Sequence, residues 1–374
     1  MARINHEKII FIVLATCLVL ISGAEGGRTI AELEIRRQLK HLNKPAVKSI
    51  KSEDGDIIDC VDIYKQLAFD HPLLKNHTIQ MRPSNYDGEI KSSSKLTEQL
   101  WHKSGSCPEG TIPVLRTRKS DLLRMVNLEN SDASVIESAK LYVEHENQGG
   151  EAIINVWNIN VEPKEWSTAS ILVSKRATTD MITAGWIVNP IVFGDNKTRL
   201  YTYWTSDSGR CYNLKCPGFI QTNKKTSLGV EISPVSTYGG SQYSFHMMIY
   251  KDLNHDNWWF YYNNEAVGYW PGTLITKMAK SADHIEWGGQ ILRTTPAGTK
   301  TQMGSGHFPD EGEGKAAFIN NCVFYHLYET IAPINFPTRA TRPFSYDISR
   351  PQNVGQQPGA SFYFGGPGGP VYAK

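Results

Sequence analysis

The sequence predicts an antiparallel β-sandwich for the larger, C-terminal part of the chain, preceded by a small mixed α/β region. From about residue 137, apolar and polar residues alternate with a period of two, as in "INVWNINVE", "RLYTYWT" and "NWWFYYNNEAVGYW". Turn-forming clusters such as "FGDNK", "TSDSG" and "LNHDN" separate these runs. No repeat of fixed period is present, so two packed sheets over 137–374 are favoured over a propeller.

The N-terminal part lacks this alternation. Residues 29–43 predict a helix, because Thr29 and Glu32 form a capping-box pattern and the apolar residues Ile35, Leu39 and Leu42 share one face. We interpret 25–115 as a separate mixed region and 116–136 as a linker. Exposed basic residues in the linker suit proteolytic nicking, although an ordinary surface loop explains them nearly as well: Arg116, Arg118, Lys119 and Arg124.

The first 24 residues predict a secretory signal peptide. Arg3 and Lys8 precede an apolar run from Ile9 to Ile21, and the small residues Ser22-Gly23-Ala24 follow it. An uncleaved anchor is the alternative, but the run is shorter than the roughly 20 residues that a membrane span needs. We therefore expect a secreted, extracellular protein, with the vacuole as a second destination and no membrane span in the mature chain.

Composition narrows the classes of ligand. The formal net charge is only +2, which argues against nucleic acid or a membrane surface as the main partner. No His or Cys cluster has zinc-site spacing, and the glycine-rich "TQMGSGH" lacks the lysine of a phosphate-binding loop. We expect no metal and no cofactor. The sequence does not predict an oligomeric state.

Five cysteines remain after the signal peptide, an odd number for an oxidising compartment. Cys211 and Cys216 are close enough to close a tight local loop. Cys60 and Cys107 would then close a long one, worth roughly 4 kcal/mol in the chain-entropy view. This pairing leaves Cys322 over.

Two further groups of residues are candidates for surface chemistry. Asn76 and Asn196 begin Asn-x-Thr sequons, which fit a secreted glycoprotein but also arise by chance. Four aromatic residues in alternating runs are candidates for a cleft that stacks on proline or sugar rings: Trp204, Trp258, Tyr269 and Trp270. Aromatics in such runs more often belong to the core.

The chain contains, in this order, the segments "DGDIIDCVDIYKQLAFDHPLLKNHTIQM", "WHKSGSCPEGTIPVLR", "AGWIVNP", "CYNLKCPGFIQTN", "VGYWPGTL", "IEWGGQI" and "TQMGSGHFPDEGEGKA". These segments and their order resemble the plant neprosin-like family. The resemblance implies a secreted glutamic endopeptidase that cuts after proline, made as a zymogen with an activation peptide before a β-sandwich. The family's C-terminal cysteines, which would offer Cys322 a partner, are absent from the tail Gly366-Pro367-Gly368-Gly369.

The same resemblance locates two catalytic glutamates, one before "AGW" and one after "WGG". One would activate water or stabilise the oxyanion, and the other would carry a proton to the leaving amine. In this chain Thr183 and Gln290 stand at those positions. A second class of glutamic peptidases works with a glutamine–glutamate pair, but Thr183 supplies no glutamate.

Other carboxylates are candidate substitutes. Glu286 precedes Gln290 by four residues on the same face of the expected strand, about 13 Å away and hence beyond direct contact with a scissile bond positioned at Gln290. Asp310, Glu311 and Glu313 lie in a glycine-rich, turn-like stretch, where most acids are solvated loop residues.

Three functions compete on this basis. The favoured one is a secreted neprosin-like pseudoenzyme with little or no peptidase activity, whose former cleft binds a proline-rich peptide or an extracellular protein. The second is an active endopeptidase at acid pH that uses displaced carboxylates. The third is a carbohydrate- or cell-wall-binding sandwich.

Overall fold

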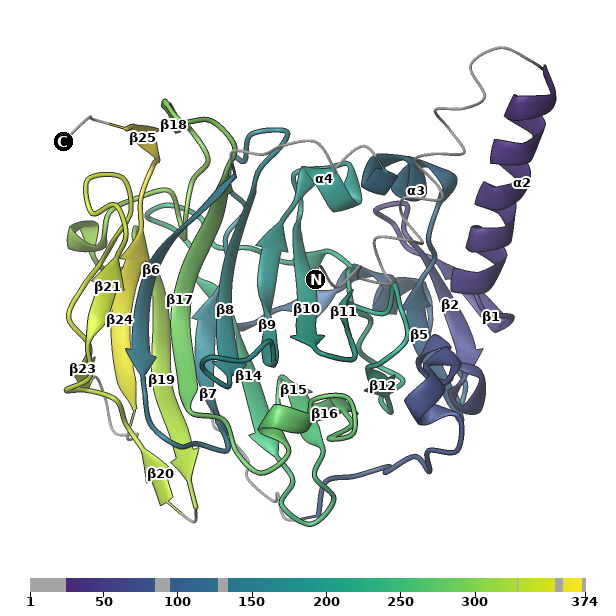
Figure 1. Ribbon diagram of the computed structural model, residues 1–374. Helices are drawn as coiled ribbons and strands as arrows, with labels where there is room; N and C mark the ends of the chain where they lie inside the picture. The colour runs from purple at the N-terminus through teal and green to yellow at the C-terminus, as the bar shows by residue number, and fades with distance from the viewer. Residues whose placement is uncertain (1–24, 85–94, 127–133, 328, 354–358, 372–374) are drawn as a thin grey trace, which may run out of the picture.

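Two large antiparallel sheets packed face to face form most of the molecule, with a small mixed region beside them (Figure 1). The computed structural model describes residues 25–84, 95–126, 134–327, 329–353 and 359–371. The predicted fold class is confirmed. The predicted signal peptide, 1–24, lies outside the described residues.

The first sheet has seven strands in the order β11-β10-β9-β8-β17-β6-β21. Its strands are β6 (Val135–Val143), β8 (Trp166–Ser174), β9 (Met181–Val188), β10 (Thr198–Ser206), β11 (Gly209–Tyr212), β17 (His284–Arg293) and β21 (Thr338–Ala340).

The second sheet has eleven strands, eight of them in the order β12-β16-β15-β14-β7-β19-β24-β22. These are β7 (Gly149–Asn155), β12 (Ile220–Gln221), β14 (Tyr243–Lys251), β15 (Trp258–Tyr262), β16 (Glu265–Trp270), β19 (Ala317–His326), β22 (Asp347–Ile348) and β24 (Ala360–Gly365). The other three, β3 (Lys95–Leu96), β20 (Glu329–Ile331) and β23 (Gln352–Asn353), pair with β14, β19 and β24.

Alternation along β17 defines the two faces of the seven-stranded sheet. Ile285 and Trp287 are fully buried and point at the eleven-stranded sheet, since a side chain added at Gly150 of β7 would touch both. Glu286 and Gln290 therefore point to the outer face. The alternation predicted for 157–161 is also confirmed: Trp157, Ile159 and Val161 are buried, whereas the asparagines between them are exposed.

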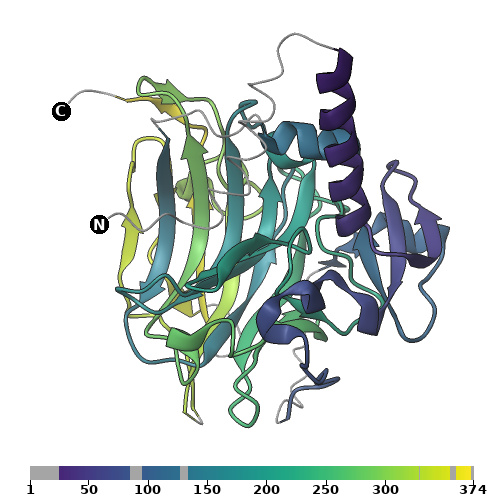
Figure 2. The same ribbon diagram turned by 45° about the vertical axis from the view of Figure 1, so that its right-hand side comes forward.

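The N-terminal region combines helices with a three-stranded sheet. Helix α2 (Glu25–Leu42) covers the predicted helix, and the sheet β1-β2-β5 consists of β1 (Ala46–Lys51), β2 (Ile57–Asp62) and β5 (Thr111–Leu115). Short helices η1 (Ile63–Lys65), η2 (Leu67–Asp70), η3 (Pro72–Leu74) and η4 (Leu100–Ser104) connect these elements. Figure 2 shows α2 and the small sheet beside the β10–β11 end of the sandwich.

The predicted linker is more structured than its sequence indicates. It contains helix α3 (Lys119–Val126), which packs against the one-turn helix α4 (Pro190–Phe193). Arg124 pairs with Asp121 and donates to the Phe193 carbonyl at 3.0 Å, so this basic residue is engaged rather than free. Tertiary contact thus stabilises a helix that is too short to be stable alone.

The predicted disulfides are confirmed. Cys60 bonds to Cys107 and Cys211 to Cys216, while Cys322 is a free thiol on β19. Cys322 is fully buried, and this burial raises the pKa of its thiol well above the ordinary value. The thiol is therefore both inaccessible and protonated at neutral pH.

We expect iodoacetamide to leave the folded, unreduced protein unlabelled at pH 8 and to label one thiol, Cys322, after unfolding in urea. Mass spectrometry of the digested protein would check this. Labelling of any of the other four cysteines without reductant would contradict the pairing.

Among the described residues, no helix is long and apolar enough to cross a membrane.

Candidate functional site

A row of small residues crosses the outer face of the seven-stranded sheet. Gly288 of β17 faces Ser170 of β8, which in turn faces Gly185 of β9. We call these three the small-residue row. Lys140 of β6 stands at one end of the row and Tyr201 of β10 at the other. A side chain at Gly185 would lie 2.0 Å from the Ala169 carbonyl oxygen, so the strand spacing there requires glycine.

Thr183 and Gln290 flank this row on a diagonal. Gln290 faces Thr168 and Thr183 faces Leu172, so Ser170 lies midway between them on β8. Each diagonal step in a sheet is about 7–8 Å. Two long glutamate side chains at these positions could therefore meet above Ser170, whereas a threonine is too short to reach.

The Thr183 hydroxyl is already hydrogen-bonded within the protein. Its Oγ1 donates to the Ile171 carbonyl at 2.9 Å and lies 3.4 Å from the Tyr201 hydroxyl. Only 7% of the residue is exposed. Neither this hydroxyl nor the Gln290 amide exchanges a proton with substrate near neutral pH.

The side chains of Glu286 and Gln290 touch, although the backbone spacing between them is about 13 Å. Gln290 Nε2 donates to Glu286 Oε1 at 2.9 Å. The backbone spacing of four residues remains, but Gly288 lies between them on the same face and has no side chain. Two long side chains can therefore lean toward each other across it.

Glu286 is held as a carboxylate by two more partners. Lys140 forms an ion pair with Oε2, and His284 Nε2 lies 3.0 Å from the same oxygen. Burial alone would raise the pKa of Glu286, but His284 and Lys140 outweigh it and hold that pKa below its ordinary value. Such a neutralised carboxylate is a weak base.

Both ends of the small-residue row are bounded. Beyond Lys140 and His284 lies a cavity of about 360 Å³ whose wall includes Tyr142, Arg176 and Arg339. At the other end Tyr201 stacks on Tyr212, with ring centroids 5.8 Å apart. The N-terminal region reaches this second end through Asp56, which accepts from Arg199 of β10 at 2.7 Å.

The other candidate acids lie elsewhere. Asp310 and Glu311 belong to the short helix η6 (Pro309–Glu311), which packs against β24 of the eleven-stranded sheet. Glu311 accepts from the Tyr238 hydroxyl at 2.8 Å and lies 2.9 Å from His307 Nδ1. Glu313 is an exposed residue after this helix. The structure does not bring these acids to Gln290.

The four candidate aromatic residues require a correction, because they are core residues. Trp204 is 1% exposed, and Trp258, Tyr269 and Trp270 are fully buried. Consecutive residues of β15 are all buried, so both faces of this strand are covered. On β16, His77 and the Gln80 amide of the N-terminal region bond the Tyr269 hydroxyl. Sequence alternation cannot reveal this second cover.

The sequons and possible metal ligands can be placed as well. Asn76 and Asn196 are both exposed and lie outside helices and strands. Within the described ranges, no three His, Cys, Asp or Glu side chains are grouped so as to hold a metal ion.

The molecule is thus a two-sheet antiparallel sandwich with an N-terminal region docked at one end and a polar cluster on the outer face. The neprosin activation peptide matches residues 49–148, and the neprosin domain matches residues 163–367. The chain belongs to the neprosin family.

Solved structures of low sequence identity are also similar. Scytalido-glutamic peptidase with a peptide-based transition-state analogue is 12% identical, with 62% of this chain and 98% of that chain covered and a TM-score of 0.32. SCP-B, an eqolisin-family peptidase in complex with the tripeptide Ala-Ile-His, is 10% identical over the same shares, with a TM-score of 0.30. The carbohydrate-binding module CBM66 from Bacillus subtilis is 8% identical, covering 44% of this chain and 81% of its own, with a TM-score of 0.22.

Proposed function

We propose that this neprosin-family protein is secreted and binds proline-rich peptide segments, free or within extracellular proteins, without cleaving them efficiently. The observation that carries the proposal is the diagonal Gln290–Ser170–Thr183, where neither end bears an ionisable group. Hydrolysis of a peptide needs a base for water and an acid for the leaving amine. The two disulfides are consistent with an oxidising, extracellular location.

A second function has one specific observation in its favour. The 2.9 Å contact between Glu286 and Gln290 places a carboxylate beside an amide, the two groups that a glutamine–glutamate peptidase requires. Two features oppose it. The amide donates to the carboxylate instead of pointing at a developing oxyanion, and Lys140 neutralises the carboxylate.

Burial of the four aromatic residues removes the feature that favoured a carbohydrate-binding sandwich.

The test measures binding and cleavage with the same proline-rich peptide. We expect saturable binding by fluorescence anisotropy and no new fragment by mass spectrometry between about pH 2 and 8. Ser170→Leu should weaken binding at least about tenfold, because the added side chain projects over the small-residue row, where both neighbours are glycines. Thr330→Leu, on an exposed position of β20, is the matched control.

Cleavage that Glu286→Gln abolishes would favour the second function instead. Absence of binding and cleavage together would refute the proposal.

A further inference from the structure

Strands of the N-terminal region pair with strands of the sandwich. Strand β3 pairs with β14, where Lys95 faces Tyr243 and Leu96 faces Ser244. A second pairing joins β4 (Glu98–Gln99) to β13 (Ile232–Ser233). If residues 25–126 left, these main-chain groups of the sandwich would lose their partners.

Two buried glutamines of the N-terminal region each make a reciprocal pair of bonds with the sandwich backbone. Gln66 donates to the Gln221 carbonyl at 3.1 Å and accepts from the Gln221 amide at 2.9 Å. Gln99 does the same with Ser227, at 2.8 Å in both directions. Both glutamines are at most 3% exposed. These amides therefore satisfy main-chain groups that water does not reach.

Two buried charged residues of the sandwich also bond to the N-terminal region across the interface. Arg199 is 4% exposed and donates to Asp56 at 2.7 Å. Asp252, 1% exposed, accepts from Gln80 at 2.6 Å and from the Ser84 amide at 2.9 Å. Separation would leave one buried cation and one buried anion short of partners, an unfavourable change.

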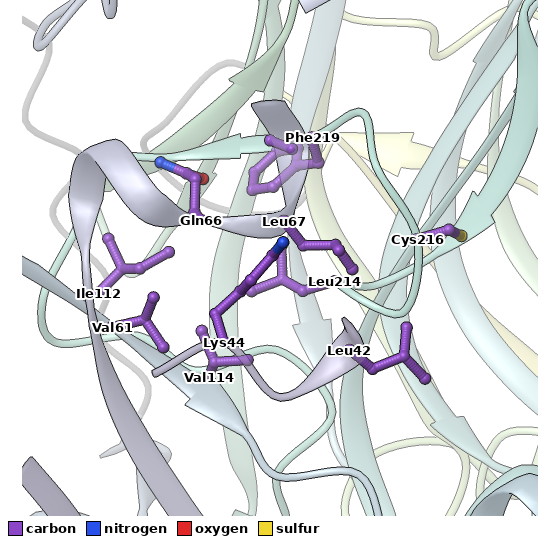
Figure 3. A pocket seen from close by; sticks show the side chains of 11 residues that line it. Leu42, Lys44, Val61, Gln66, Leu67, Ile112, Val114, Leu214, Cys216 and Phe219 are labelled. Carbon is purple, nitrogen blue, oxygen red and sulfur yellow. The ribbon is translucent and has the colours of Figure 1, made fainter. Parts of the chain in front are cut away.

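The apolar part of the interface is closely packed. Figure 3 shows Leu42, Val61, Leu67, Ile112 and Val114 of the N-terminal region around Leu214 and Phe219 of the sandwich. The space that remains among them is about 20 Å³, roughly what one water molecule needs. On the other side of the sandwich end, His77 and Gln80 cover Tyr269.

No covalent bond among the described residues joins the two parts except the chain itself. The disulfide Cys60–Cys107 lies within the N-terminal region, and Cys211–Cys216 lies within the sandwich. Cleavage between α3 and β6 would therefore test non-covalent association alone.

We propose that residues 25–126 are a permanent part of the folded protein, which stay bound to the sandwich after the chain between α3 and β6 is cut. The β10–β12 end of the sandwich then has this chain's own N-terminal region as its permanent partner. When the N-terminal region stays bound, Asp56 keeps its hydrogen bond to Arg199. The end of the small-residue row at Tyr201 therefore stays covered. The inference does not depend on what the outer face binds.

The experiment uses full-length secreted protein with a site-specific protease sequence inserted between Val126 and Val135. The folded protein is cut at neutral pH without reductant and chromatographed at about 1 µM on a sizing column. We expect about nine-tenths of the two fragments to co-elute, as a dissociation constant near 10 nM requires. Separate elution, or precipitation of the C-terminal fragment alone, would overturn the proposal.

A second variant tests the two glutamine anchors. Gln66→Ala with Gln99→Ala should weaken association about 100-fold, which lowers the co-eluting share to about four-tenths at the same concentration. The control is Gln38→Ala, because the Gln38 amide donates to Glu34 within the same helix, α2, at 3.1 Å. Equal retention in the double variant and the control would refute the role of these glutamines as anchors.

Discussion

Replacing both Thr183 and Gln290 by glutamate should give acid-dependent cleavage of proline-containing peptides, at least about 100-fold above the wild-type background. The two positions lie on one diagonal across Ser170, at a separation that two glutamate side chains can bridge. The gain should stay far below the factor of about 10⁶ that a central catalytic group can contribute. The surrounding residues are not adjusted to the new pair, and misplacement by about 1 Å costs roughly 100-fold.

Glu286 determines how the new pair would ionise. A glutamate at position 290 would lie beside the Glu286 carboxylate, which Lys140 and His284 hold in its charged form. Like charges at this distance cannot both ionise easily, so the new carboxyl should be the one that keeps its proton. Its raised pKa suits a general acid, and it should also lower the melting temperature of Gln290→Glu near neutral pH.

The comparison needs both single variants as controls. Thr183→Glu alone and Gln290→Glu alone should remain near the wild-type background when cleavage is followed by mass spectrometry from pH 2 to 8. Robust wild-type cleavage, lost in Glu286→Gln or after mutation of Asp310, Glu311 or Glu313, would contradict this account and establish a displaced dyad.

The sequence predicted the sandwich because period-two alternation reports directly which face of a strand is buried. It predicted both disulfides because Cys211 and Cys216 are close in the chain, and because the tail lacks the cysteines that the family resemblance would offer Cys322, which left Cys60 and Cys107 to pair. It could not predict the contact between Glu286 and Gln290. That contact depends on side chains leaning across Gly288, and spacing along a strand describes only the backbone.

The prediction that four aromatic residues line a binding cleft was wrong for a related reason. Alternation in β15 and β16 marks one face as core, but Tyr269 is also covered by residues almost 200 positions earlier, His77 and Gln80. The same holds for α3, whose helix depends on contact with α4. Long-range cover of this kind leaves no local signal in the sequence.

Lys140→Met should lower the free energy of unfolding at pH 7 by about 3–5 kcal/mol, because it leaves the Glu286 carboxylate buried without its main cation. The side chains of Glu286 and Lys140 are 6% and 22% exposed, so solvent screens this pair little. His284 and Gln290 still contact the carboxylate in the variant, which favours the lower end of the range. Urea unfolding followed by tryptophan fluorescence would measure the loss.

The pH dependence separates this effect from lost packing. In the wild type the pKa of Glu286 lies below its ordinary value of 4.5, so its stabilising contribution is complete above pH 4.5 and disappears as the pH falls through the lowered pKa. Without Lys140, burial raises the pKa, and the charged form costs stability at neutral pH. The deficit of the variant should therefore shrink steeply between pH 7 and about 3.5.

Two controls complete the prediction for Lys140. Lys280→Met removes an exposed lysine and should change stability by less than about 0.5 kcal/mol at either pH. Adding Glu286→Gln to Lys140→Met removes the unpaired charge and should recover most of the loss at pH 7, since the two residues are directly coupled. A deficit of equal size at pH 7 and 3.5, unchanged by Glu286→Gln, would mean that the lysine stem acts by packing and that Glu286 is not held as a buried charge.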